Sequence, residues 1–237
     1  MLTTDLSIVN NHLYISLEGY DWLLDTGSPK SFGNSSSLTI DGHTFSINKP
    51  SKHLSTFELS LYINHDTAGL LGTDILNNFN ILFDLFHQKV TLSTRHIDLK
   101  GEHLPLSSHF GTPAISSTID HKHYTMFFDT GAPLSYFQDS SLTSYPSVGT
   151  VEDFYPETGH FTTESYAVDM ELGNELITLP CGTLPLELDT VVHALGADGI
   201  VGNSILTQRE IGYFPLENEL VIGAEEYDYE HHEDVAL

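Results

Sequence analysis

The sequence predicts an all-β protein made of two similar halves. Short apolar segments that alternate with polar residues and stop at turns run along the chain, as is typical of β-strands. Long segments with the 3.6-residue period of a helix are missing. A stretch from the first part of the chain also returns in the second part, which indicates a repeated structure. We therefore expect an all-β protein with two similar lobes.

The repeat consists of two blocks. Residues 24–32 (LDTGSPKSF) return 104 positions later as residues 128–136 (FDTGAPLSY). Residues 69–76 (GLLGTDIL) return 130 positions later as residues 199–206 (GIVGNSIL). Each copy thus places an Asp-Thr-Gly after an apolar strand and follows it with an apolar Gly-x-x-Gly segment, for which we expect a single helical turn afterwards.

The offset grows by 26 residues between the two blocks, which places an insertion in the second copy between about Tyr136 and Met170. Aromatic and β-branched residues flank a Pro/Gly turn there and predict a β-hairpin over about residues 150–172. The other segments are also short and turn-bounded. Examples of predicted strand regions in the first copy are residues 6–8, 13–17, 38–47 and 90–92.

The apolar alternation lapses near residues 99–105, where Gly and Pro appear. We therefore expect an N-terminal lobe over residues 1–100, which lacks the hairpin, and a C-terminal lobe over residues 101–224. Residues 225–237 form an acidic, polar tail that we expect to be flexible. The second lobe and tail carry 23 acidic and 2 basic residues, so most of the negative charge lies there.

The composition excludes several classes of function. The 237 residues carry a formal charge of −25, which argues against a nucleic acid or an anionic membrane surface as partner. No apolar run approaches the roughly 20 residues that span a bilayer. The first basic residue is Lys30, so the start lacks the charge of a signal peptide; we expect a cytoplasmic protein, with a trimmed secreted form left open. The lone Cys181 excludes a disulfide framework and is expected to be a small buried residue.

The two Asp-Thr-Gly motifs predict one shared active site. If the copies face each other across a pseudo-twofold axis, Asp25 and Asp129 meet at this axis. Two carboxylates about 3 Å apart cannot both ionise and hold one proton between them. One can then take a proton from water while the other donates to a substrate carbonyl. The glycine of each motif allows close backbone approach, and the threonine can hydrogen-bond across the axis.

At these residues the sequence resembles the pepsin-like and retropepsin-like aspartic peptidases. The resemblance rests on four segments and covers nearly the whole chain except the acidic tail. These segments are Asp25-Thr26-Gly27-Ser28, Asp129-Thr130-Gly131-Ala132, Gly69-Leu70-Leu71-Gly72 and Asp198-Gly199-Ile200-Val201-Gly202. The inserted hairpin also resembles the flap of pepsin, although here it lies in the C-terminal copy.

The resemblance implies the bilobal acid-protease fold and an endopeptidase that acts on peptides or unfolded proteins without a cofactor or metal. Because one chain holds both aspartates, a monomer suffices. Asp25 and Asp129 would be the catalytic dyad, supported by the residues that follow each of them: Thr26, Gly27, Ser28, Thr130, Gly131 and Ala132. Tyr155 would be the flap tyrosine, and Gly159 and Phe161 would cover the bound peptide beside it.

The position after each glycine differs between the copies, Ser28 against Ala132. A Ser28 hydroxyl could hydrogen-bond the charged carboxylate and lower its pKa, whereas Ala132 provides no such donor. The acidic second lobe favours a retained proton. We therefore predict a weakly acidic optimum rather than one below about pH 3.

Three other interpretations stay open. A peptide-binding protein could keep the same fold without turnover. A glycoside hydrolase with a carboxylate pair would fit the two aspartates but neither the repeat nor the flap. A metal site could use His231-His232 or His121-x-His123, but neither pair has enough rigidly spaced partners for zinc, and solvated histidines are the favoured interpretation.

Overall fold

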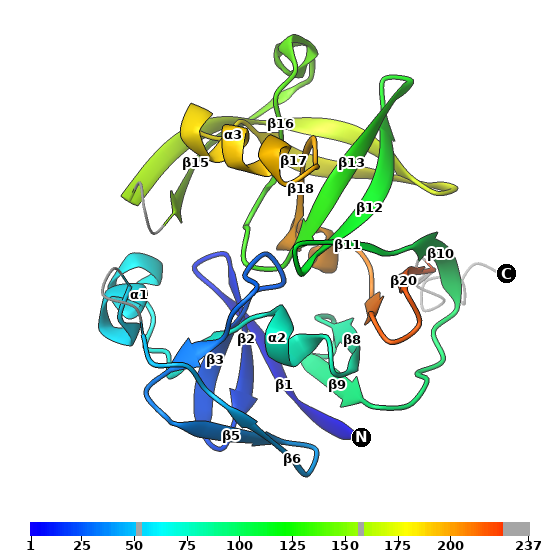
Figure 1. Cartoon of the computed structure of the whole chain (residues 1–237). Coiled ribbons are helices and arrows are strands. Elements are labelled where there is room, and N and C mark those ends of the chain that lie inside the picture. Colours follow the sequence, from blue (N-terminus) through cyan, green and yellow to red (C-terminus); the bar gives the residue numbers. More distant parts are fainter. Residues whose placement is uncertain (51–53, 156–158, 225–237) are drawn as a thin grey trace, which may run out of the picture.

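The structure, a computed structural model, describes residues 1–50, 54–155 and 159–224. The described chain is mostly β-strand (Figure 1), as the sequence predicts. The strands of the first hundred residues are β1 (Leu2–Val9), β2 (His12–Leu17), β3 (Tyr20–Leu24), β4 (Phe32–Gly33), β5 (Ser37–Ile40), β6 (His43–Ser46), β7 (Gly69–Leu71), β8 (Asn80–Asp84) and β9 (Lys89–Ser93). The predicted acidic tail, residues 225–237, lies outside the described residues.

The remaining strands follow the same short pattern, apart from the long pair β15 and β16. They are β10 (Gly101–Pro105), β11 (Ser107–His109), β12 (Thr112–Ile119), β13 (Lys122–Asp129), β14 (Ser135–Phe137), β15 (Ser147–Tyr155), β16 (Gly159–Leu172), β17 (Glu175–Gly182), β18 (Gly199–Gly202), β19 (Ile211–Phe214) and β20 (Glu219–Gly223). The predicted hairpin therefore forms from β15 and β16, and its turn at residues 156–158 lies outside the described residues.

Two large sheets organise the chain. A ten-stranded sheet has the order β10-β20-β19-β8-β9-β1-β2-β3-β7-β4, and an eight-stranded sheet has the order β11-β12-β13-β18-β14-β17-β16-β15. A separate hairpin joins β5 to β6. In Figure 1 the eight-stranded sheet lies above strands β1–β9.

The sequence repeat is also a repeat of strand pairing. Strand β3 pairs in parallel with β7, with Trp22 opposite Gly69, and β13 pairs in parallel with β18, with Met126 opposite Gly199. Strands β4 and β14 then add antiparallel to β7 and β18. These registers keep the offsets of 104 and 130 residues found in the sequence. Each Asp-Thr-Gly therefore follows the same three-stranded arrangement.

The chain segment near residues 99–105 does not interrupt the sheet. Its residues 101–105 form β10, which pairs with β20, while β19 pairs with β8 of the first half. Strands from the second half thus complete the ten-stranded sheet. The largest buried cluster likewise contains side chains of both halves, among them Phe83 and Ile211. Cys181 is fully buried in this cluster, which confirms the expectation for the lone thiol.

Five helical segments of the described chain accompany the sheets. The turns expected after each Gly-x-x-Gly are present as α2 (Thr73–Leu76) and the 3-10 segment η2 (Asn203–Thr207). Two longer helices, α1 (Thr56–Ile63) and α3 (Leu186–Ala194), were not predicted, and η1 (Ser140–Ser144) is a further short 3-10 turn. Helix α1 begins with a capping box, in which Ser55 and Glu58 bond each other's backbone N–H.

Among the described residues, no helix is long and apolar enough to cross a membrane.

Candidate active site

The two aspartates lie at the ends of equivalent strands. Asp25 follows the last residue of β3, and Asp129 is the last residue of β13. The buried strands β7 and β18 lie beside them and fix both ends in place. The two carboxyl groups hydrogen-bond each other, so the structure brings Asp25 and Asp129, hereafter the dyad, into direct contact.

The threonines of the two motifs are locked together beneath the dyad. Thr26 N–H donates to Thr130 Oγ1 at 3.1 Å, and Thr130 N–H donates to Thr26 Oγ1 at 2.9 Å. Each hydroxyl then donates to the carbonyl of the residue before the opposite aspartate, Phe128 at 2.6 Å and Leu24 at 2.9 Å. Both threonines are fully buried, so every polar atom of this cross-link has a partner within the protein.

The glycines of the motifs let the two main chains approach the opposite carboxyl group. A Cβ atom on Gly131 would lie 2.6 Å from Cγ of Asp25, and one on Gly27 would collide with the carboxylate of Asp129. Gly27 N–H can therefore donate to Asp129 Oδ1 across the two halves, at 3.2 Å. Each aspartate also accepts from its own loop, Asp25 from Ser28 N–H at 2.9 Å and Asp129 from Gly131 N–H at 2.8 Å.

The surroundings favour one shared proton. Burial raises the pKa of Asp25, and the negative charge of Asp129 and the hydrogen bond between the carboxyl groups raise it further. Burial also raises the pKa of Asp129, although the backbone N–H groups that donate hydrogen bonds to this carboxylate lower it. Because the two groups are coupled, they titrate as a unit that holds one proton over a range of pH.

The expected role of the Ser28 hydroxyl is wrong. Its Oγ donates to the carbonyl of Lys30 at 3.0 Å, and the group that reaches Asp25 is the backbone N–H of Ser28. On the other side, a backbone hydrogen bond from Ala132 lowers the pKa of Asp129. Serine and alanine therefore make the same main-chain contribution. The asymmetry that we inferred from their side chains does not exist.

Above the dyad lies a cavity of about 320 Å³. One apolar wall belongs to the first half and includes Leu23, Phe32 and Leu70; the other belongs to the second half and includes Phe127 and Ile200. Helix α3 closes the second wall, through residues missed in the sequence although their spacing is helical: Leu188, Val191, Val192 and Leu195.

The hairpin of β15 and β16 covers this cavity in part. Tyr155 lines the cavity together with Asp153 and Phe154. Gly159 and Phe161, which the sequence also predicts beside the site, are not among the lining residues. Phe161 instead lies behind the wall, with its ring 6.4 Å from that of Tyr136. Of the three predicted flap residues, Tyr155 therefore lines the cavity that contains the dyad.

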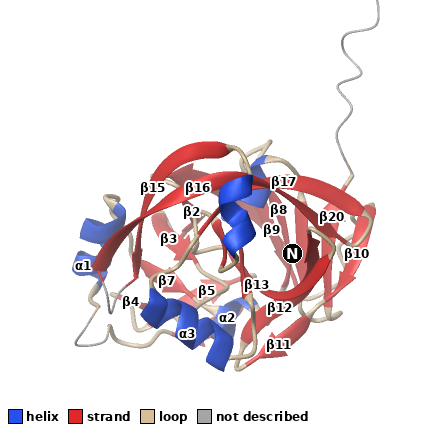
Figure 2. Ribbon diagram, turned by 90° about the horizontal axis from the view of Figure 1, so that it is seen from above, coloured by secondary structure: helices blue, strands red, loops and turns tan. Residues whose placement is uncertain are grey.

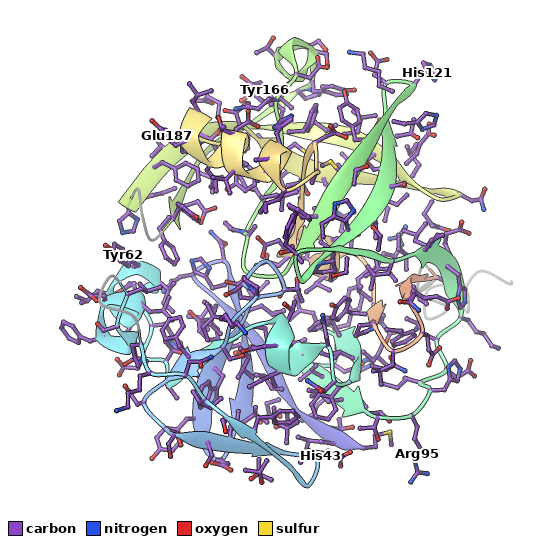
Figure 3. The ribbon with its side chains drawn as sticks, in the orientation of Figure 1. His43, Tyr62, Arg95, His121, Tyr166 and Glu187 are labelled. Carbon is purple, nitrogen blue, oxygen red and sulfur yellow. The ribbon has the colours of Figure 1, made fainter. Side chains whose placement is uncertain are left out.

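The same hairpin reaches across to the first half of the chain. The ring of Phe154 stacks on that of Tyr62 from α1, with centroids 5.2 Å apart and an angle of 6° between the planes. His160 lies against the same tyrosine, with its ring centroid 5.5 Å away. Figure 3 shows Tyr62 where α1 faces the hairpin, and the view from above shows β15 running toward α1 (Figure 2). The cavity is thus bridged on one side by an aromatic contact between the halves.

Several supporting residues were not recognised in the sequence. Ser31 Oγ donates to Asp74 Oδ1 at 2.6 Å and accepts from Gly72 N–H at 2.8 Å, which ties the dyad loop to the Gly-x-x-Gly segment. In the second copy Ser135 Oγ accepts from Gly202 N–H at 3.3 Å. Ser31 and Ser135 match within the repeat, so the repeat itself contained the signal that could have identified them.

A second matching pair flanks the motif glycines. The hydroxyl of Thr112, the first residue of β12, donates to the carbonyl of Gly27 at 3.5 Å. His12, the first residue of β2, hydrogen-bonds the backbone of Gly131. Burial lowers the pKa of His12 to about 4, so the ring is neutral near pH 7. Because different residue types fill the two positions, the repeat gave no signal for them.

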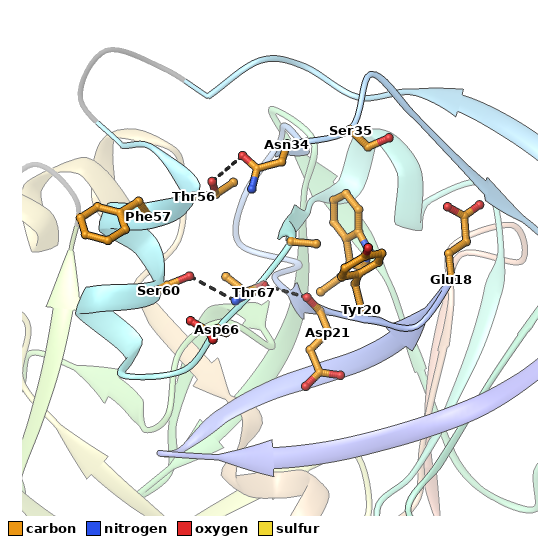
Figure 4. Close-up of a pocket in the computed structure, with 12 residues that line it drawn as sticks. Glu18, Tyr20, Asp21, Asn34, Ser35, Thr56, Phe57, Ser60, Asp66 and Thr67 are labelled. Atoms are coloured by element: carbon orange, nitrogen blue, oxygen red, sulfur yellow. Dashed lines mark hydrogen bonds between the residues drawn. The ribbon is translucent and has the colours of Figure 1, made fainter.

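A larger cavity, of about 740 Å³, lies in the first half and contains neither dyad carboxylate. Glu18, Tyr20, Asp21 and Phe57 are among the residues that line it (Figure 4). Its polar groups largely bond one another, as when the Thr67 hydroxyl donates to the carbonyl of Asp21 at 3.0 Å. This arrangement offers no pair of carboxyl groups in contact and no matching main-chain donors.

The histidine pairs considered as metal ligands fall into two groups. His231 and His232 lie outside the described residues, and His121 and His123 are exposed. Within the described ranges, ligand atoms of Asp84, His87 and Glu210 lie within 4.8 Å of one another. The Nδ1 atom of His87 is already 2.8 Å from Asp84 Oδ2, an ordinary imidazole–carboxylate contact that explains the proximity.

Comparison of the sequence with models of known protein families gave no match, and comparison with curated proteins gave no significant match.

Proposed function

We propose that this chain is an aspartic endopeptidase with a bilobal acid-protease fold, in which two small β-barrel lobes related by a pseudo-twofold axis enclose the site. The observation that carries this proposal is the dyad. Asp25 and Asp129 contact each other, line the cavity, and each accept a backbone N–H from the equivalent residue of their own motif, Ser28 and Ala132. Their raised pKa values support a singly protonated pair at weakly acidic pH.

Such a pair supplies both proton transfers that amide hydrolysis needs. The ionised carboxylate takes a proton from a water molecule, whose oxygen attacks the carbonyl carbon of the scissile amide. The protonated carboxyl gives its proton to the carbonyl oxygen, which yields a neutral diol. The first carboxyl then passes its proton to the amide nitrogen, the C–N bond breaks, and one diol hydroxyl returns a proton to the other carboxylate. Acid and base have exchanged roles, and the dyad again holds one proton.

The cavity fits a peptide that is bound in extended form. Its two apolar walls lie on either side of the dyad, and β15 with Tyr155 covers it from above. Residues on alternate sides of an extended peptide would enter the two walls. Both aspartates come from one chain, so the proposed enzyme works as a monomer and needs no metal or cofactor for either proton transfer.

The test is hydrolysis of a mixed peptide library from about pH 3 to pH 8. Asp25→Asn and Asp129→Asn should each lower cleavage by at least roughly a thousandfold, because the pair then lacks either its base or its shared proton. The matched control is Asp98→Asn, an exposed aspartate for which cleavage should stay unchanged. The wild-type rate should be greatest at weakly acidic pH.

A statine-type transition-state mimic separates the alternatives. If the wild type binds the mimic but cleaves nothing, the chain is a peptide-binding protein on the same fold. If it neither cleaves peptides nor binds the mimic, the proposed function is wrong. If Asp25→Asn and Asp129→Asn cleave peptides as fast as the wild type does, the proposed role of the dyad is also wrong.

A further inference from the structure

The cavity contains a third carboxylate besides the dyad. Asp153 lies on β15, two residues before Tyr155, and its side chain lines the cavity. Asp153 Oδ2 accepts from the hydroxyl of Tyr136 at 2.6 Å, and Oδ1 accepts from the N–H of Phe154 at 2.7 Å. Among the described residues that line the cavity, none is a lysine or an arginine. The carboxylate therefore faces the cavity with two neutral donors, and no lysine or arginine among the lining residues pairs with it.

A buried carboxylate of this kind is costly when it is ionised. Burial raises the pKa of Asp153 to about 6, although the two hydrogen bonds oppose the effect. The titratable groups around it come from three elements: Asp129 at the end of β13 raises the pKa, His160 on β16 lowers it, and the neutral Tyr136 on β14 donates its hydroxyl. His160 itself pairs with the exposed Glu152, at 3.0 Å. A positive charge that enters the cavity would thus meet an ionisable carboxylate that no lysine or arginine of the lining residues neutralises.

We propose that Asp153 determines specificity, by selecting peptides that carry a lysine or arginine side chain next to the scissile bond. This inference rests on the proposed peptidase function. The wall beside Asp153 includes Leu184, Val192 and Ile200, which suit the aliphatic stem of such a side chain, while the carboxylate receives its charged end. The formal charge of −25 acts in the same direction, because it draws cationic peptides toward the molecule.

The experiment compares two peptides that are blocked at both ends. They differ at one residue next to the scissile bond, which is lysine in one peptide and norleucine in the other. At about pH 7 the wild type should cleave the lysine peptide with at least a roughly tenfold higher kcat/KM, the value of one good charge-assisted hydrogen bond. Asp153→Asn should abolish this preference while it retains cleavage of the norleucine peptide. The matched control is Glu152→Gln, which removes the same charge from the neighbouring exposed residue and should keep the preference.

The pH profile gives a second readout. The ratio of lysine to norleucine cleavage should rise as the pH passes through about 6 in the wild type, because Asp153 ionises there, and should stay flat in Asp153→Asn. A third peptide, with norleucine and a free N-terminal amine, tests the other source of positive charge. Faster cleavage of this peptide than of the blocked lysine peptide would assign the carboxylate to the amine and overturn the proposal.

Each failure has its own signature. If the wild type cleaves the lysine and norleucine peptides equally, Asp153 does not select cations. If Asp153→Asn lowers cleavage of both peptides by the same factor, the residue acts only by anchoring the hairpin through Tyr136. If the wild type cleaves no peptide of any sequence, the proposed function is at fault; binding of the uncleaved lysine and norleucine peptides by calorimetry then still tests the preference for a cation.

Discussion

The paired threonines show how a few atoms define the site at the scale of single residues. Each hydroxyl of Thr26 and Thr130 accepts from the opposite main chain and donates to it. Four hydrogen bonds thus fix the separation of the two strands that bear the dyad. Because the threonines are buried, water cannot replace any of these bonds when one hydroxyl is removed.

Thr26→Val keeps the shape of the side chain and removes its hydroxyl. It leaves the N–H of Thr130 and the carbonyl of Phe128 buried without partners, so we expect a loss of about 1–3 kcal/mol in the free energy of unfolding. Urea denaturation measures this loss. Thr3→Val, at an exposed strand position, removes a single hydroxyl–hydroxyl bond to Thr91 and should change stability by less than about 0.5 kcal/mol. Equal effects of the two substitutions would contradict the structural role of the cross-link.

The duplicated motif made the dyad predictable, but it did not reveal the pair of Tyr136 and Asp153. Asp25, Thr26 and Gly27 each have a counterpart 104 residues later, and a twofold arrangement leaves few other places for them. The bond between Tyr136 and Asp153 depends instead on where the hairpin lies over β14. That placement follows from the register of β15 against β16 and from packing against α1, and neither can be read from local residue patterns.

At the scale of secondary-structure elements, the most informative contact is the one between the hairpin and α1. Strand β15 is an edge strand of the eight-stranded sheet, and its far end lies against a helix of the other half. The sequence contained the start of α1, since Ser55 and Glu58 have capping-box spacing. With only eight residues, however, α1 lacks the length that makes helical periodicity stand out.

Tyr62→Ala should loosen the hairpin, because it removes the ring on which Phe154 stacks. We expect faster amide hydrogen exchange in β15 near Phe154 and a higher KM for peptides, with little change in overall stability. Phe57→Ala is the control, since Phe57 lies on the same helix with its side chain 71% exposed. Unchanged exchange in β15 would show that the aromatic contact does not hold the hairpin over the cavity.

At the scale of the whole molecule, the two halves share one sheet. Strand β19 of the second half pairs with β8 of the first half. Strands β10, β20 and β19 thus form one end of the ten-stranded sheet, and strands of the first half form the rest of it. The repeat predicted two similar halves, but it could not show this exchange of strands. The offset of 130 residues between residues 69–76 and 199–206 did not indicate that the strands which follow them, β8 and β19, pair with each other.

A shared sheet and core should make unfolding cooperative across both halves. The chain provides one reporter in each: Trp22, its single tryptophan, on β3, and Cys181, its single cysteine, on β17. Both side chains are buried. In urea, the change in tryptophan fluorescence and the gain in thiol reactivity should have the same midpoint. Two separate midpoints would mean that the halves unfold independently.

The strand order also indicates where the molecule can be attached to a solid support. Strand β20 lies next to one end of the ten-stranded sheet, while β3, β7 and β4, which carry and flank the first dyad motif, form the other end. Gly223, the last residue of β20, therefore lies near the opposite end of the strand order from the strands around Asp25 (Figure 1). We expect a molecule that is attached to a solid support through β10, the strand at this edge of the sheet, to keep its cavity accessible to dissolved peptides.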